Sequence, residues 1–200
     1  MSNLGILAEY KNKIMRLLAS DEKYRKLLSP NESECEDLDV VDVILGGEWI
    51  INGKKWKEQG HLFDHDFVDD AVTDKKVFTF VDANITNITN NMFVDFTLFI
   101  IPFTDKDLIR LSPYSSPTAQ EVKEMNLFAS NTYANRIDAM CERIDDLMMN
   151  QENNNLKGIG EVIPMPRNFM TTYRPNNQYY GKCLQYQIKN YNVGVECGIN

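Results

Sequence analysis

The sequence predicts an α+β fold, in which a small, mainly antiparallel twisted sheet has helices packed on one face. Three observations predict it. Apolar residues recur at helical spacing in two parts of the chain, two pairs of segments are rich in β-branched and aromatic residues, and a short polar stretch joins each pair. Short connections between neighbouring strands favour antiparallel pairing.

Two helices are expected at the start of the chain. The first places five apolar residues on one face, namely Leu7, Tyr10, Ile14, Leu17 and Leu18. Asp21 and Glu22 suit the first turn of a second, shorter helix, and Ser29-Pro30 is expected to end it.

Residues 31–74 form an acidic insertion within a single domain that spans residues 1–200. The segment holds thirteen acidic and three basic residues, a net charge of −10, while the whole chain carries −8 and the remainder therefore about +2. It is too rich in Val, Ile and Trp for a disordered tail. Asn52-Gly53 is typical of a two-residue hairpin turn, so a hairpin is expected between residues 48–51 and 54–56.

The sheet is expected to begin with strands at 76–83 and 92–103, separated by the polar turn or extended loop NITNITNN. A helix at 132–149 follows, with a continuous apolar stripe formed by Ile137, Met140, Cys141, Ile144, Leu147 and Met148. Two further strands are expected at 161–173 and 182–192, with RPNNQYYG as the turn between them.

Composition and charge exclude several classes of protein. A pI of about 4.8 argues against a protein that coats DNA or RNA, which needs a basic face. No apolar run approaches the roughly 20 residues of a membrane span, and the first residues do not resemble a secretion signal. The four cysteines lack paired zinc-ligand spacing and are expected to be reduced and packed.

The sharpest cluster of candidate metal ligands lies in the insertion. It consists of His61, Asp64, His65 and Asp66, followed by Asp69 and Asp70. Two imidazoles and several carboxylates are the donors of a metal-dependent hydrolase. However, the spacing fails the calcium-loop pattern, and catalytic metal sites usually draw ligands from separate elements. A solvated acidic loop is therefore favoured, with no metal, no cofactor and no catalytic residues.

A second candidate is a group of aromatic and basic residues near the C-terminus: Tyr173, Tyr179, Tyr180, Tyr186 and Tyr191, with Arg167 and Arg174. Such a group can stack on single-stranded nucleic acid. Aromatic residues of a strand core or a protein interface are commoner, and that interpretation is favoured.

Three segments, taken together in order, resemble a known group of proteins. They are TDKKVFTFVDANI with the following MFVDFTLFIIPF, then NRIDAMCERIDDLM, and finally GIGEV with YYGKCLQYQIKNYN. They resemble neck or tail-completion proteins of tailed bacteriophages and prophages, similar to the tail-terminator group. The resemblance covers residues 1–30 and 73–192, whereas residues 31–72 match nothing in that group.

The resemblance implies a structural protein of the virion, assembled in the host cytoplasm, that is not an enzyme. Tail terminators form a ring, usually a hexamer, between the tail tube and the neck connector. The implied partners are further copies of the chain, the tube protein and the connector, with DNA only as cargo passing through the lumen and no membrane. Like charge would then keep DNA from adhering if the acidic insertion faced the lumen.

Three alternatives stay open. The first is a head-completion or connector ring protein of the neck. The second is a metal-dependent hydrolase that uses His61, Asp64, His65 and Asp66. The third is an accessory protein that binds a host factor.

Overall fold

The structure is a computed structural model, and it describes residues 3–28, 46–51, 54–64, 77–89, 92–109, 135–149, 161–174 and 178–189. Their central feature is a six-stranded sheet in the order β3-β4-β5-β8-β6, with β7 also paired to β8. Its strands are β3 (Leu62–Phe63), β4 (Val77–Thr89), β5 (Met92–Asp105), β6 (Glu161–Pro164), β7 (Met170–Tyr173) and β8 (Tyr179–Lys189). All pairs are antiparallel except β3 with β4. The predicted α+β class and mainly antiparallel sheet are confirmed.

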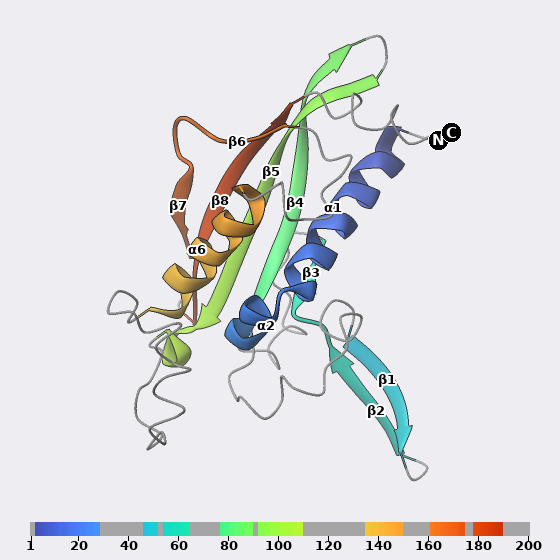
Figure 1. Ribbon diagram of the computed structural model, residues 1–200. Helices are drawn as coiled ribbons and strands as arrows, with labels where there is room; N and C mark the ends of the chain where they lie inside the picture. The colour runs from blue at the N-terminus through green and yellow to red at the C-terminus, as the bar shows by residue number, and fades with distance from the viewer. Residues whose placement is uncertain are drawn as a thin grey trace.

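Within the described ranges, three helices cover one face of this sheet, as predicted (Figure 1). They are α1 (Asn3–Ser20), α2 (Glu22–Leu28) and α6 (Arg136–Met149), and a short 3-10 helix, η2 (Lys106–Leu108), follows β5. The apolar stripes expected of α1 and α6 pack on alternate residues of the long strands, such as Val81, Leu98 and Leu184. This layer is the main hydrophobic core.

The opposite face of the sheet carries a second cluster of buried residues, made of Phe78, Phe80, Ile101, Phe103, Tyr179 and Cys183. The ring centroid of Phe103 lies 5.2 Å from that of Phe78 and 5.3 Å from that of Phe80. Both faces of the sheet are therefore apolar near the C-terminal end of β5.

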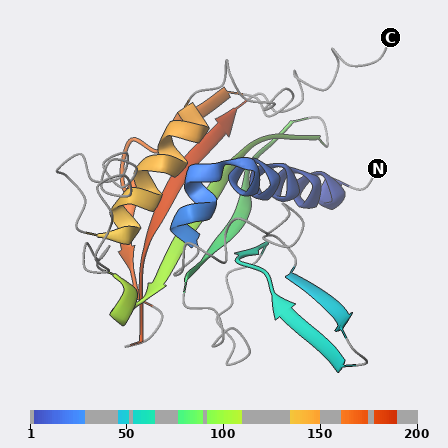
Figure 2. The same ribbon diagram turned by 60° about the horizontal axis from the view of Figure 1, so that its bottom comes forward.

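The expected hairpin in the insertion is confirmed. β1 (Gly46–Ile51) and β2 (Lys54–Gln59) form a two-stranded sheet of their own, and the register runs from Gly46↔Gln59 to Ile51↔Lys54. Asn52-Gly53, the expected turn, lies outside the described residues. The hairpin extends away from the body of the molecule in both views (Figures 1 and 2).

Two expectations about the sheet are wrong. Residues 84–89 belong to β4 rather than to a loop, because pairing with β5 continues to Thr89↔Met92 across register shifts around Asn87. The strand expected at 161–173 is divided into β6 and β7, since Pro164 and Pro166 carry no N–H for continuous pairing and Asn168 has a left-handed φ of 60°.

The last strand begins earlier than expected. Tyr179–Gly181 pairs with Phe103–Asp105 of β5 instead of forming a turn. Gly181 permits this close pairing, because a Cβ at this position would lie 2.6 Å from the carbonyl oxygen of Pro102. The expected turn spans residues 174–181, and residues 175–177 of it lie outside the described residues.

Candidate functional site

His61, the first of the candidate metal ligands, is a structural residue. The residue is only 7% exposed, and its Nδ1 donates a hydrogen bond to the carbonyl oxygen of Val77 at 2.8 Å. Its own carbonyl accepts a hydrogen bond from the backbone N–H of Thr79, also at 2.8 Å. Both contacts hold the start of β3 to β4.

Asp64 lies on the surface, and its carbonyl oxygen accepts a hydrogen bond from Nζ of Lys11 on α1. His65, Asp66, Asp69 and Asp70 lie outside the described residues. Within the ranges that are described, no three His, Cys, Asp or Glu side chains gather as a metal site requires.

The aromatic and basic group near the C-terminus is divided between the two faces of the sheet. Tyr179 belongs to the cluster opposite the helices, whereas Tyr186 is buried under α6 and its hydroxyl donates to Oδ1 of Asp145 at 3.0 Å. Tyr180 lies under the guanidinium of Arg174, 5.5 Å from its ring centroid. Tyr191 lies outside the described residues. The group therefore does not form one stacking surface.

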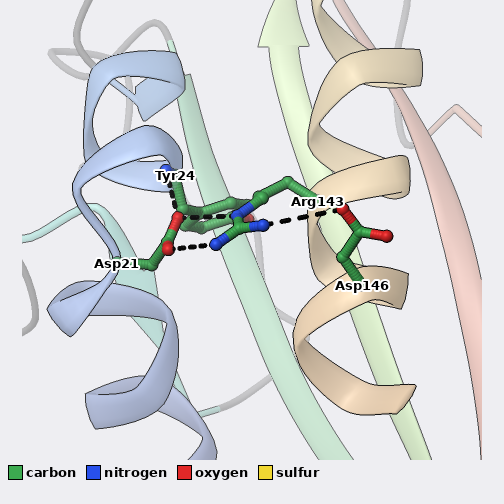
Figure 3. A network of polar contacts seen from close by, with 4 residues as sticks. All are labelled: Asp21, Tyr24, Arg143 and Asp146. Carbon is green, nitrogen blue, oxygen red and sulfur yellow. Dashed lines mark hydrogen bonds and ion pairs between the residues drawn. The ribbon is translucent and has the colours of Figure 1, made fainter. Parts of the chain in front are cut away.

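The most connected group of charges lies between α2 and α6 (Figure 3). Arg143 donates through Nε to Oδ1 of Asp21 at 2.9 Å and through one terminal nitrogen to Oδ2 at 2.5 Å. The other terminal nitrogen lies 3.5 Å from Asp146. Asp21 also accepts from the backbone N–H of Tyr24 at 2.7 Å, so it caps α2, as its place in the sequence indicates.

The electrostatics of this group follow from its contacts. Burial opposes ionisation of Asp21, but the hydrogen bonds from Arg143 and Tyr24 and the nearby positive charge outweigh burial and lower its pKa. The same hydrogen bond raises the pKa of Arg143. Both groups are charged at neutral pH, which suits a helix anchor rather than a proton-transfer site.

Other polar side chains also fasten helices to their surroundings. Arg136 is buried and donates to the carbonyl oxygens of Leu27 (2.8 Å) and Leu108 (3.2 Å), joining α6 to α2 and η2. Nζ of Lys182 on β8 lies 2.5 Å from Oδ1 of Asp138 on α6. Burial raises the pKa of the nearby Cys141 to about 12, so this thiol is protonated and a poor nucleophile at neutral pH.

The described features that suit partner binding lie at two sides of the molecule. The β1–β2 hairpin projects beyond β3, and the β6–β7 edge, defined here as residues 161–174, closes the other side of the sheet (Figure 1). The edge includes Met170, which is 47% exposed, and the exposed Arg167 and Arg174. The sequence predicted the hairpin, but a methionine followed by two threonines gave no signal that its side chain faces solvent.

Comparison with known proteins gives one family. The model of the YomW family, which is phage-derived and of Bacillus prophage type, matches residues 12–188. No curated protein and no solved structure matches the chain. None of the helices that the structure describes is long and apolar enough to cross a membrane.

Proposed function

Because the chain belongs to the YomW family, we propose that this phage-associated protein is a tail-completion subunit of the tail-terminator type. In this proposal, copies of the chain form a ring, a hexamer where the tail has sixfold symmetry, between the tail tube and the neck connector. The ring ends growth of the tube and gives the connector a docking surface. DNA passes through its lumen.

One observation carries the proposal. A sheet covered by helices on one face presents a projecting hairpin at one side and a broken edge of two short strands at the other (Figure 1). Different surfaces at opposite sides favour heterologous contacts between copies, which build rings when the rotation closes. Several described side-chain pairs anchor the helices to one another or to the sheet, such as Asp21–Arg143 and Asp138–Lys182.

The proposal is tested by deleting the gene from the prophage that encodes it and inducing particle production. We expect DNA-filled heads without attached tails, together with tails of irregular or excessive length in electron micrographs. A plasmid copy of the gene should restore tails of uniform length that carry heads.

The alternative neck position gives a different result. A head-completion or connector ring protein acts on the head side, so its loss leaves tails of uniform length and heads that lose their DNA. That outcome would replace the tail-terminator proposal. Particles of normal number and morphology without the gene would exclude both positions.

A further inference from the structure

We propose that the outer side of β7 binds an extended acidic segment of a partner protein, which adds to the sheet as a further strand. β7 (Met170–Tyr173) lies outermost on the side of the sheet away from α1 (Figure 1). The inference goes beyond the proposed function and does not depend on it, because the addition of a strand requires one edge of one chain and no ring.

The direction of the backbone groups of β7 follows from its pairing with β8. The N–H of Gln185 donates to the carbonyl oxygen of Phe169 at 2.8 Å, and the pairing continues through β7 without a register shift. In an antiparallel pair, alternate residues direct both backbone groups toward the partner strand. Thr171 is therefore bonded to β8, whereas Met170 and Thr172 direct their N–H and C=O groups outward.

These outward groups form an open edge. In the described part of the chain, no strand pairs with the outer side of β7. Met170 is 47% exposed and Thr172 is also exposed, so both residues are open to solvent. The N–H and C=O groups of both residues are thus positioned to form ladder hydrogen bonds with a further strand.

Other edges of the sheet carry features that oppose strand addition, and β7 lacks these features. On β4, beyond the short pairing with β3, Oδ1 of Asp82 accepts from the N–H of Ala83 at 2.8 Å, and Nζ of Lys11 lies 3.5 Å from the same oxygen. β6 ends in Pro164, which has no N–H. β7 has the sequence MTTY, without proline or charge. It is therefore the edge best suited to accept another chain.

Positive charge on both sides of β7 favours an acidic partner. Arg167 precedes the strand and Arg174 follows it, and both are exposed. The nearby Lys182 and Asp138 neutralise each other, since Nζ and Oδ1 are 2.5 Å apart. The one acidic residue of the β6–β7 edge, Glu161, lies at the start of β6. Acidic side chains at both ends of the added strand would therefore be attracted to the two arginines.

Met170 specifies the residue that faces it. Its register partner is Leu184, which belongs to the core under the helices, so the side chain of Met170 lies on that face of the sheet. A residue paired with Met170 on an added strand lies on the same face, and an apolar side chain there covers the exposed thioether. The partner is thus an extended segment with β-branched residues in its centre and acidic residues at both ends.

A fluorescent peptide serves as the probe. Its sequence, Asp-Asp-Val-Thr-Val-Thr-Val-Asp-Asp, has the proposed pattern, and a control peptide has Lys in place of each Asp. Fluorescence anisotropy during titration with the purified chain should give a dissociation constant of about 10–100 μM for the acidic peptide, because the contact is much smaller than a stable interface. The lysine peptide should bind at least about tenfold more weakly.

Two substitutions at Thr172 separate backbone pairing from side-chain contact. Thr172→Pro removes the outward N–H and keeps the pairing with β8, in which this N–H takes no part. It should weaken binding of the acidic peptide at least about tenfold. Thr172→Ala, the matched control, keeps the N–H and should bind as wild type. Circular dichroism and the thermal midpoint verify that both variants are folded.

The two arginines are tested together. The double variant Arg167→Gln with Arg174→Gln should bind the acidic peptide about three- to tenfold more weakly and should lose much of the salt dependence of binding. Arg16→Gln with Lys23→Gln is the matched control, because it removes the same charge from exposed positions of α1 and α2 and should bind as wild type.

The inference is overturned by equal binding of the acidic and lysine peptides, by binding to Thr172→Pro as tight as to Thr172→Ala, or by the absence of binding up to roughly 1 mM of chain. Association of the chain with itself that Thr172→Pro abolishes, without binding of the acidic peptide, would also overturn it and assign the edge to a second copy.

Discussion

Arg143 on α6 binds both carboxylate oxygens of Asp21, the residue between α1 and α2 that caps α2. These residues are 122 positions apart in the sequence. The contact fixes the junction of the two N-terminal helices against α6 and thereby helps to hold the layer of helices on the sheet (Figure 3).

Asp21→Asn should lower the free energy of unfolding by about 1–3 kcal/mol, because the change removes a charge-assisted contact and leaves Arg143 without its main partner. Urea denaturation at pH 7 measures the loss. Glu9→Gln is the matched control, since the Glu9–Lys13 pair is largely exposed and should contribute less than about 0.5 kcal/mol. Equal losses in both variants would contradict the role given to Asp21.

The same aspartate predicts a pH dependence. Its pKa in the folded chain is lowered from the ordinary value of 3.8, so its contribution is present above that value and is lost as the pH falls through the folded pKa. The free energy of unfolding should therefore fall below about pH 5 more steeply in wild type than in Asp21→Asn. Parallel curves from urea titrations between pH 7 and pH 3 would count against this assignment.

Cys141 should resist thiol reagents in the folded chain. Burial raises its pKa to about 12, so at pH 8 the thiolate fraction is about a thousandfold below that of an ordinary cysteine. Mass spectrometry after brief alkylation should find Cys141 unmodified until urea unfolds the chain. Modification of Cys141 in the native chain, at the rate of the unfolded chain, would show that α6 opens readily.

Gly181→Ala should weaken the sheet at the pairing of β5 with β8. The added Cβ would lie 2.6 Å from the carbonyl oxygen of Pro102, so one strand must move, at a cost of about 1–3 kcal/mol. The thermal midpoint measures the effect. Thr172→Ala, at an exposed position of β7, is the control and should change stability by less than about 0.5 kcal/mol. An unchanged midpoint for Gly181→Ala would exclude the close pairing described here.

His61→Ala should destabilise the chain by about 2 kcal/mol, because the buried ring and its hydrogen bond to Val77 are lost. Removal of divalent metals from wild type with a chelator should leave the thermal midpoint unchanged. A fall in the midpoint on chelation, restored by zinc, would revive the metal-dependent hydrolase that uses His61, Asp64, His65 and Asp66.

Local sequence signals predicted the helices and the hairpin well. The apolar stripe of α6 and the pair Asn52-Gly53 each act over a few residues, and the register that ends at Ile51↔Lys54 confirms the hairpin. The sequence predicts a polar turn or extended loop at residues 84–89 because of Asn84 and Asn87, whose type is depleted in strands. Pairing with the start of β5 places these residues in β4 instead.

The contacts of the candidate functional residues could be predicted less well from the sequence than the helices and the hairpin. The parallel pairing of β3 occupies two residues, so no periodicity marks it, and the structural role of His61 depends on Val77 across that pairing. The Asp21–Arg143 contact joins distant parts of the chain. Met170 is 47% exposed on β7, and no periodicity of the surrounding sequence marks this strand as separate from β6.

The segment that carries the hairpin is anchored to the rest of the molecule at both of its ends, near Leu27 and at His61. Arg136 binds the last turn of α2 through the carbonyl oxygen of Leu27, and His61 is held by Val77 and Thr79 where the segment returns. Because the cost of closing a loop grows slowly with its length, the segment between these points can lengthen, shorten or change composition with little effect on the body. Descendants of such a protein can therefore diversify in what they recognise while inheriting the same scaffold.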